Sequence, residues 1–338
     1  MSHCWMYQKL KGAYFAKRGG PLANPADMSV ILCTYTEDRW EDLVKAVESV
    51  RCQSAPPREI IVVVDHNPGL LERVQANLPG VIALENRGMP GASEARNSGV
   101  MEAKGKFVAF LDDDAAAAPD WLEQHYSGYE GADVLGVGGE IEPVWTTARP
   151  RWFPEEFNWV IGATYRGFPE STSSIRNLWT VNMSVRREIF DAIQGFRSGF
   201  GKVGNNSSPE DTDFCIRALQ YRPQGIWLYK PEAKVRHKVP PSRASWNYYL
   251  WRCYNEGLGK AKLSSLVGVK YSISAERTHM SKTLPTGFAR GLTDGLLRRD
   301  PSGYGRAAAI LLGLAAAIIG YSIGMISEPF RKHAGEAG

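Results

Sequence analysis

Short apolar runs recur along the first third of the chain. They occupy Met28–Thr34, Glu59–Asp65, Val81–Glu85 and the residues that lead to Asp112, and the second run is almost entirely valine and isoleucine. Runs of this length, bounded by turn-forming residues, are typical of strands, and one this rich in β-branched residues is too apolar to face water on either side. Each run is therefore predicted to be a β-strand.

Stretches with helical spacing separate these strands. Trp40–Gln53 places apolar residues from Leu43 to Val50 at helical spacing, and Gly69–Asn77 and Gly91–Ala103 are further helix-like stretches. Strand and helix alternate four times. The pattern therefore predicts an α/β fold with a doubly wound, mostly parallel sheet and right-handed crossovers.

A long uncharged segment lies near the C-terminus. Ala307–Ile326 has 20 residues and no charge, which is enough, at about 1.5 Å rise per residue, to cross a hydrocarbon layer of about 30 Å. It is predicted to span a membrane or to lie in its interface, and the alternative is a buried core helix. Arginines between Arg290 and Arg306 outnumber the basic residues after the segment, which favours a cytoplasmic N-terminal side. Gly320 and Gly324 have the spacing that supports close helix packing.

Composition narrows the choice of partner and compartment. The chain has 338 residues, 40 of them basic and 36 acidic, and a net charge of +4 is too small to favour nucleic-acid binding. Five scattered cysteines without a CxxC pair favour neither a zinc site nor a disulfide framework. Residues 1–27 lack the continuous apolar core of a signal peptide. The catalytic part is therefore expected in the cytoplasm.

Three carboxylates stand at the end of the fourth predicted strand. Ligands of open α/β sheets bind outside the carboxyl ends of the strands, and carboxylate oxygens suit Mg²⁺ or Mn²⁺. In an extended strand end, positions two apart point to the same side, so Asp112 and Asp114 can converge while Asp113 points away. We predict Asp114 as a direct metal ligand and Asp112 as a ribose or second metal contact. A turn or a helix cap is the alternative.

Polar residues also follow the first two predicted strands. Asp65 ends a valine-rich strand and can accept hydrogen bonds from a nucleobase or ribose, although Asp-His-Asn-Pro-Gly is also a turn sequence. Thr34 and Thr36 follow the first strand, where they can meet the same nucleotide or cap the next helix. The three residues are predicted nucleotide contacts.

Six motifs occur in order along the chain: Cys33-Thr-Tyr-Thr36, Asp65, Ala95-Arg-Asn-Ser-Gly99, Asp112-Asp-Asp114 before Pro119-Asp-Trp, Asn182-Met-Ser-Val-Arg-Arg187, and Glu210-Asp211 with Arg217. Each motif is weak singly. In this order and spacing they resemble the family 2 glycosyltransferases of GT-A fold, over roughly residues 28 to 240. The resemblance does not specify the sugar.

The resemblance implies roles on the nucleotide side of the site. Arg96 is expected to bridge to the pyrophosphate, with a solvated helix arginine as the alternative. His237 is expected to supply another metal ligand or a phosphate contact, although a surface histidine in a basic loop fits the sequence nearly as well. Mg²⁺ or Mn²⁺ is the implied cofactor, bound by Asp114, Asp112 and His237.

The resemblance also implies roles on the acceptor side. Asp211 is expected to be the general base that removes the acceptor proton, and Glu210 is expected to orient the acceptor or its loop. Both residues open a predicted helix, so capping is the alternative. Trp179 and Asn182 are expected to line the sugar or acceptor pocket, although Trp179 also suits a core position.

These expectations combine into one function. The Gln-x-x-Arg-Trp motif of processive members of the family does not follow Asp211, so a single sugar is expected to be added. The reaction is transfer with inversion from a nucleotide-diphosphate sugar to a hydroxyl of a membrane-associated acceptor, most simply a lipid-linked saccharide in glycan biosynthesis. The catalytic domain is expected to face the cytoplasm at the cell membrane. A sugar-phosphate nucleotidyltransferase and a non-catalytic, membrane-tethered saccharide-binding scaffold are the alternatives.

The expected organisation has six parts. They are an N-terminal extension (1–27), a Rossmann-like nucleotide-sugar-binding half (28–130), an acceptor-binding and catalytic half (131–262), a basic juxtamembrane segment (263–306), a transmembrane or interfacial helix (307–326) and a short tail (327–338).

Overall fold

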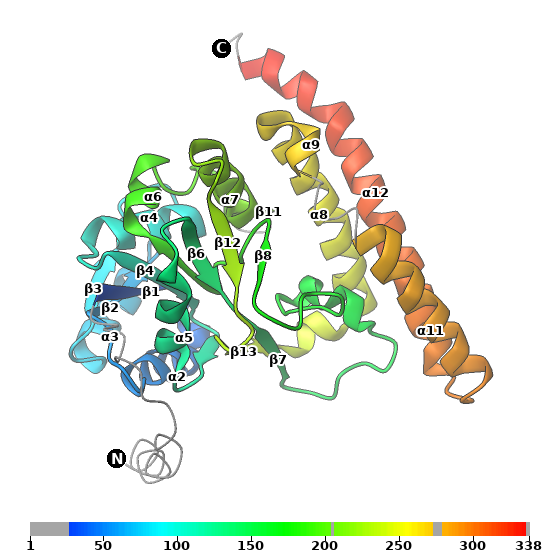
Figure 1. The fold of residues 1–338 in the computed structure, drawn as a ribbon, viewed down its shortest axis with the longest axis horizontal. Coiled ribbons are helices and arrows are strands. Elements are labelled where there is room, and N and C mark those ends of the chain that lie inside the picture. Colours follow the sequence, from blue (N-terminus) through cyan, green and yellow to red (C-terminus); the bar gives the residue numbers. More distant parts are fainter. Residues whose placement is uncertain (1–26, 204–205, 273–278, 336–338) are drawn as a thin grey trace.

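The computed structural model describes residues 27–203, 206–272 and 279–335, and a large mixed sheet forms its centre (Figure 1). The first half of the sheet contains the predicted strands, in the order β3-β2-β1-β4 and all parallel. These strands are β1 (Met28–Thr34), β2 (Glu59–Val64), β3 (Ile82–Glu85) and β4 (Phe107–Asp112). The predicted α/β fold with a large sheet is confirmed.

The second half of the sheet changes direction. The strand order continues from β4 through β9 (Asn182–Arg186), β6 (Val134–Gly138) and β12 (Ile226–Tyr229) to β8 (Ser173–Ile175). The strand β9 runs antiparallel to both β4 and β6, whereas β12 is parallel to β6 and antiparallel to β8. The chain therefore inserts a late strand beside β4, which the alternation of strand and helix did not predict.

Helices cover both faces of the sheet. Successive residues of β1 and β2 therefore point into two different cores, one on each face. One core contains Leu32 with residues of α2, α3 and α5, and the other contains Ile31 with residues of α4, α6 and α7. The bounds of these helices are α2 (Trp40–Arg51), α3 (Pro68–Asn77), α4 (Ala92–Glu102), α5 (Trp121–Ser127), α6 (Arg187–Ala192) and α7 (Glu210–Tyr221). Two-sided burial explains why the strands are continuous apolar runs.

Two small sheets and several short helices complete the α/β part of the chain. The strand β13 (Val235–Val239) lies between β5 (Ala115–Ala117) and β7 (Ile141–Trp145), and β10 (Gly201–Val203) pairs with β11 (Asn206–Ser208). The short helices are η3 (Glu37–Arg39), η4 (Gly128–Glu130), η5 (Glu155–Ile161) and η6 (Pro241–Ala244). The β5-β13 pairing brings residues from two distant parts of the sequence together, because β5 begins immediately after Asp114 and β13 contains His237.

The C-terminal helices form a separate layer beside the catalytic part (Figure 1). They are α8 (Trp246–Val267), α9 (Val269–Ser272), η7 (His279–Thr283), α11 (Leu284–Leu296) and α12 (Ser302–Gly335). A side chain at Gly320 would lie 2.1 Å from the carbonyl oxygen of Tyr254, and one at Gly257 would lie 2.1 Å from that of Ala317. The small residues predicted to support close helix packing therefore bring α12 against α8 of the same chain.

The predicted organisation can be compared with these elements. The boundary at 130/131 falls between η4 and β6, whereas the boundary at 262/263 falls inside α8, so the segment predicted as basic and juxtamembrane begins within that helix. The predicted membrane segment lies inside the longer α12. Nearly all of the N-terminal extension and the last three residues of the tail lie outside the described residues.

Candidate functional site

A cavity of about 2080 Å³ runs from the carboxyl ends of the central strands to the C-terminal helices. Its lining includes Thr34 after β1, Asp65 after β2, Asp112 at the end of β4, Asp211 on α7 and Ile318 on α12. The strand ends supply the polar part of the cavity, as expected for an open α/β sheet. The helical layer supplies the opposite wall.

Asp112, Asp114 and His237 form one cluster. Their ligand atoms all lie within 4.8 Å of one another. In the β5-β13 ladder Ala115 is opposite His237, and the Lys238 amide donates to the Asp114 carbonyl oxygen over 2.9 Å. This pairing brings His237 Nε2 to 3.1 Å from Asp114 Oδ1.

The backbone of Gly162 lies close against the imidazole ring of His237. Gly162 has a φ of +74°, and a Cβ there would lie 2.8 Å from the imidazole ring. The left-handed backbone and the close approach both favour glycine at this position.

Two arginines that the sequence analysis missed neutralise the aspartates. Arg39 Nη1 lies 2.8 Å from Asp113 Oδ1 and 3.2 Å from Asp114 Oδ2, and Arg243 Nη2 lies 4.0 Å from the same Asp114 oxygen. Burial alone would raise the pKa of Asp114, but His237, Arg39 and Arg243 outweigh it and lower that pKa below its usual value. At Asp113 burial prevails and raises the pKa to about 6.

The composition of the cluster fits a divalent cation. Two carboxylates and one imidazole are ligands that Mn²⁺ accepts, and the carboxylates also suit Mg²⁺. Asp113 is outside the cluster, but it does not point away from Asp114 as predicted, because the same Arg39 nitrogen contacts both carboxylates. The extended alternation ends at Asp112, and residues 113 and 114 form a turn. No spacing rule singles out Arg39 or Arg243, because each reaches the aspartates only through the fold.

The predicted nucleotide contacts have different surroundings. Asp65 accepts hydrogen bonds from Asn86 Nδ2 over 2.6 Å and from the Gly91 amide over 2.8 Å, so it also holds the loop before α4. Thr34 is buried in the cavity wall. Thr36 accepts a hydrogen bond from the Asp38 amide and caps η3, away from the cavity lining. Its surroundings match the capping alternative.

Arg96 connects Asp112 of the cluster to Glu210 at the start of α7. It is 6% exposed, and its guanidinium lies 3.3 Å from Asp112 Oδ1 and 3.0 Å from Glu210 Oε1. Burial opposes its charge, but Asp112 and Glu210 raise the pKa of Arg96 above its usual value. Both observed partners are carboxylates, and the pyrophosphate contact stays a prediction.

Asp211 has the ionisation expected of a base. It is half-buried in the first turn of α7, where its Oδ1 accepts a hydrogen bond from the Thr212 amide over 2.6 Å. Burial, followed by the neighbouring Glu210, raises the pKa of Asp211 to about 7. A carboxyl of this kind exchanges protons near neutral pH.

Trp179 and Asn182 lie in different places. Trp179 lines the cavity and packs against Phe168, with ring centroids 5.3 Å apart. Asn182 is 1% exposed; its Oδ1 accepts from Trp121 Nε1 and its Nδ2 donates to the Ala233 carbonyl, each over 2.7 Å. The prediction that Asn182 lines the acceptor pocket is corrected, because its amide joins β9 to the interior and does not reach this cavity.

Comparisons with known proteins agree with this site. The sequence model of glycosyl transferase family 2 matches residues 29–194. The chain is 33% identical over 244 residues to the glucosyl-dolichyl phosphate glucuronosyltransferase of Haloferax volcanii, covering 71% of this chain and 78% of that protein. It is 27% identical over 241 residues to the succinoglycan biosynthesis protein ExoM of Rhizobium meliloti, covering 69% and 73%.

A solved structure has a similar fold. The mannosyltransferase of Pyrobaculum calidifontis, in complex with GDP-Man and Mn²⁺, superposes with a TM-score of 0.54 and 15% sequence identity over 93% of each chain. At this identity the likeness concerns the fold alone, and it agrees with the predicted GT-A architecture.

Proposed function

The chain belongs to glycosyl transferase family 2, and we propose that it transfers a single sugar, with inversion, from a nucleotide-diphosphate sugar to a hydroxyl of a lipid-linked acceptor. The observation that carries the proposal is the common cavity. It contains both the Asp112-Asp114-His237 cluster and Asp211, whose pKa is raised to about 7. The cavity therefore offers a place for a charged leaving group and a base for the attacking hydroxyl.

Asp211 is the proposed general base. It takes the proton of the acceptor hydroxyl while that oxygen forms a bond to the anomeric carbon and the bond from that carbon to the diphosphate breaks. Attack opposite the leaving group inverts the anomeric configuration. Arg96 holds Glu210 beside Asp211, which keeps the negative charge that raises the base's pKa.

Asp112, Asp114 and His237 are the proposed ligands of Mg²⁺ or Mn²⁺. When bound, the cation neutralises the nucleoside diphosphate, so that no leaving-group acid is required. Asp65 and Thr34 are proposed to contact the nucleoside, and the same contact is proposed for Thr36, which also caps η3. Residues 28–130 and 131–262 are the proposed donor and acceptor halves.

The acceptor proposal rests on two observations. The name of the Haloferax relative includes a glucosyl-dolichyl phosphate, and one helix among the described residues, at Ser302–Ser327, is long and apolar enough to cross a membrane. Together they support a saccharide on a lipid phosphate as the acceptor. The further proposal that the catalytic domain faces the cytoplasm rests on the basic residues that precede the apolar segment. Family membership and the presence of Asp211 in the cavity argue against the nucleotidyltransferase and scaffold alternatives.

The test is a panel of nucleotide sugars, screened by thermal shift with Mn²⁺ and then by transfer to polyprenyl-phosphate-linked saccharides in detergent. We expect one donor to stabilise the chain by about 2.7 kcal/mol at 100 times its dissociation constant. NMR of the product should show that the transferred sugar has the anomeric configuration opposite to that of the donor. Binding without transfer to any hydroxyl acceptor would contradict the proposal.

A further inference from the structure

The outer face of α12 is an exposed apolar stripe. Its side chains are 45–68% exposed at Leu311, Leu312, Ile318, Ile319, Ile323 and Ile326. No charged residue occurs from 307 to 327, and only 28% of the most apolar window, with a mean hydropathy of 2.2, is buried. A continuous apolar surface of this kind marks a contact with a membrane or another protein.

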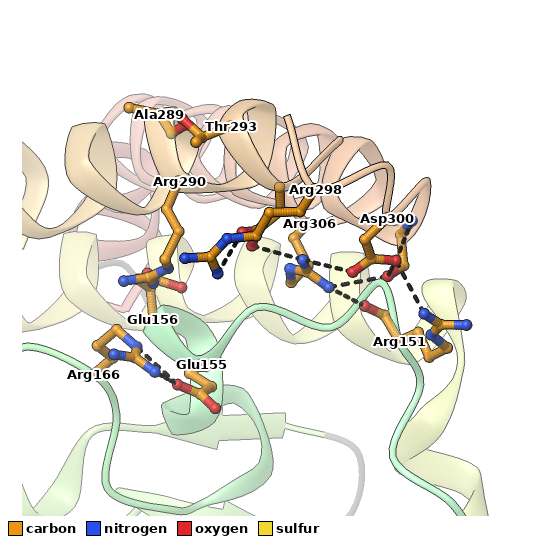
Figure 2. A network of polar contacts seen from close by, with 12 residues as sticks. Arg151, Glu155, Glu156, Arg166, Ala289, Arg290, Thr293, Arg298, Asp300 and Arg306 are labelled. Atoms are coloured by element: carbon orange, nitrogen blue, oxygen red, sulfur yellow. Dashed lines mark hydrogen bonds and ion pairs between the residues drawn. The ribbon is translucent and has the colours of Figure 1, made fainter. Parts of the chain in front are cut away.

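The opposite face of α12 is fixed to α8. Besides the glycine contacts, the Tyr249 hydroxyl donates to the Ala309 carbonyl over 2.9 Å, and the hydroxyls of Ser264 and Tyr321 lie 3.2 Å apart. The start of α12 is tied as well: Arg306 reaches Asp294 and Asp300 at 2.9 and 3.1 Å (Figure 2). The helix is therefore packed on the folded domain from Arg306 to Gly324.

This attachment decides how α12 meets a bilayer. If α12 spanned the membrane, α8 would enter the hydrocarbon beside it with Arg252, Glu256 and Lys260, and each such charge is costly there. If α12 lies in the interface, only the uncharged stripe enters the lipid. The charges of α8 then stay on the domain side of α12.

The cavity reaches the same stripe. Its wall includes Leu314, Ala317, Ile318 and Tyr321 from α12 and Trp251 from α8. Ile318 is 51% exposed and Trp251 is 44% exposed, so these side chains belong both to the cavity wall and to the outer surface. One end of the cavity is therefore an apolar mouth beside the α12 stripe.

Charged side chains of α8 also line this cavity, together with Asp211. Arg252, Glu256 and Lys260 lie one turn apart on α8 and all line the cavity. Lys260 also acts on Asp211, whose pKa its charge lowers against the larger effect of burial. A lipid phosphate has the matching order of parts, with an apolar chain, an anionic group and then a sugar.

We propose that the acceptor enters sideways from the leaflet that contains the α12 stripe, with its lipid chain in the mouth formed by Trp251, Leu314 and Ile318. Its phosphate lies against Arg252 and Lys260, and its sugar hydroxyl reaches Asp211. The inference rests on the proposed function and assigns a subsite to the lipid part of the acceptor.

The test uses the full chain on vesicles of phosphatidylcholine and phosphatidylglycerol. The probe is a long-chain polyprenyl phosphate with a diazirine in its first isoprene units, and mass spectrometry maps the labelled peptides. Ile318→Gln is compared with Ile319→Gln, which changes a neighbouring isoleucine of 53% exposure outside the cavity wall. Vesicle sedimentation should fall equally for the two variants, since both lose one stripe residue.

We expect labelling of peptides that contain Trp251, Leu314 or Ile318. Its yield per bound protein should fall about tenfold for Ile318→Gln and less than about twofold for Ile319→Gln. Absence of labelling, labelling spread along the outer stripe, or equal falls in both variants would overturn the proposal. Labelling of the mouth by this probe, together with no transfer to polyprenyl-phosphate-linked saccharides in a parallel assay, would refute the proposed function instead. Transfer to a short water-soluble saccharide without mouth labelling would refute only the lipid subsite.

Discussion

Asp211→Asn should separate the catalytic cost of the Asp211 carboxylate from its cost to stability. Asparagine keeps an oxygen that can accept the hydrogen bond from the Thr212 amide, now 2.6 Å long, but it cannot take a proton from the acceptor. We expect kcat to fall by about 10²–10⁴ while donor binding is unchanged, because a base that acts on the acceptor need not touch the donor. In the unmodified chain, kcat should rise as the pH passes through about 7.

The same substitution should stabilise the fold at high pH. The pKa of Asp211 is raised from 3.8 to about 7, so its stabilising contribution is present below about pH 4 and is lost as the pH rises through about 7. At about 1.4 kcal/mol per pKa unit, this rise corresponds to about 4 kcal/mol. Part of the residue is exposed to solvent, so we expect the variant to gain about 2–4 kcal/mol above pH 7 and almost nothing at pH 4.

Urea unfolding of both chains at pH 4, 6 and 8 measures this difference, and Asp213→Asn is the matched control. Asp213 is on the same turn of α7 but fully buried, and it pairs with Arg217 at 2.8 Å and Arg197 at 3.3 Å. Breaking a buried ion pair from one side costs about 3–5 kcal/mol, so the control should lose stability at pH 8. If Asp211→Asn also loses stability there, or keeps kcat within about tenfold, Asp211 is a helix cap and the assignment as base is wrong.

Three further predictions concern the metal and the helical layer. Asp114→Asn should weaken Mn²⁺-dependent donor binding at least tenfold in a thermal-shift titration, because changes at a metal site typically cost about this much affinity. Asp113→Asn should weaken that binding less than about threefold. Equal losses in the two variants would contradict the proposed metal ligands. Gly320→Leu should cost about 1–3 kcal/mol or more, because its side chain meets the α8 backbone, whereas Ala315→Leu on the exposed side should leave the unfolding midpoint unchanged. Alkaline carbonate should release the full chain from vesicles, and retention would indicate a spanning helix.

The strand ends were predictable because they follow from local sequence. A run such as Glu59–Val64 is apolar on both faces, and the position of Asp112 at the end of such a run places it at the edge where ligands bind. Local patterns therefore located the strand ends that line the polar part of the cavity. Strand alternation alone does not place Asp114 beside Asp112, because β4 ends at Asp112 and the next two residues form a turn.

The rest depended on contacts between distant segments. Arg39 meets Asp113 across 74 positions of sequence, and the β5-β13 ladder brings in His237 from more than 100 positions away. Asn182 follows a short segment with no marked periodicity, and its burial results from the insertion of β9 between β4 and β6. For α12, composition indicated an apolar helix, but only the packing on α8 distinguishes an interfacial placement from a spanning one.

One short segment connects the helical layer to the metal cluster. Glu156, in η5, is 2% exposed and forms an ion pair with Arg290 of α11 (Figure 2). Loss of that partner would leave an uncompensated charge in the interior, so the pair fixes α11 against η5. The same segment ends at Gly162, which supports the ring of His237. One short segment, η5 with Gly162 at its end, thus contacts both α11 of the helical layer and the ring of His237.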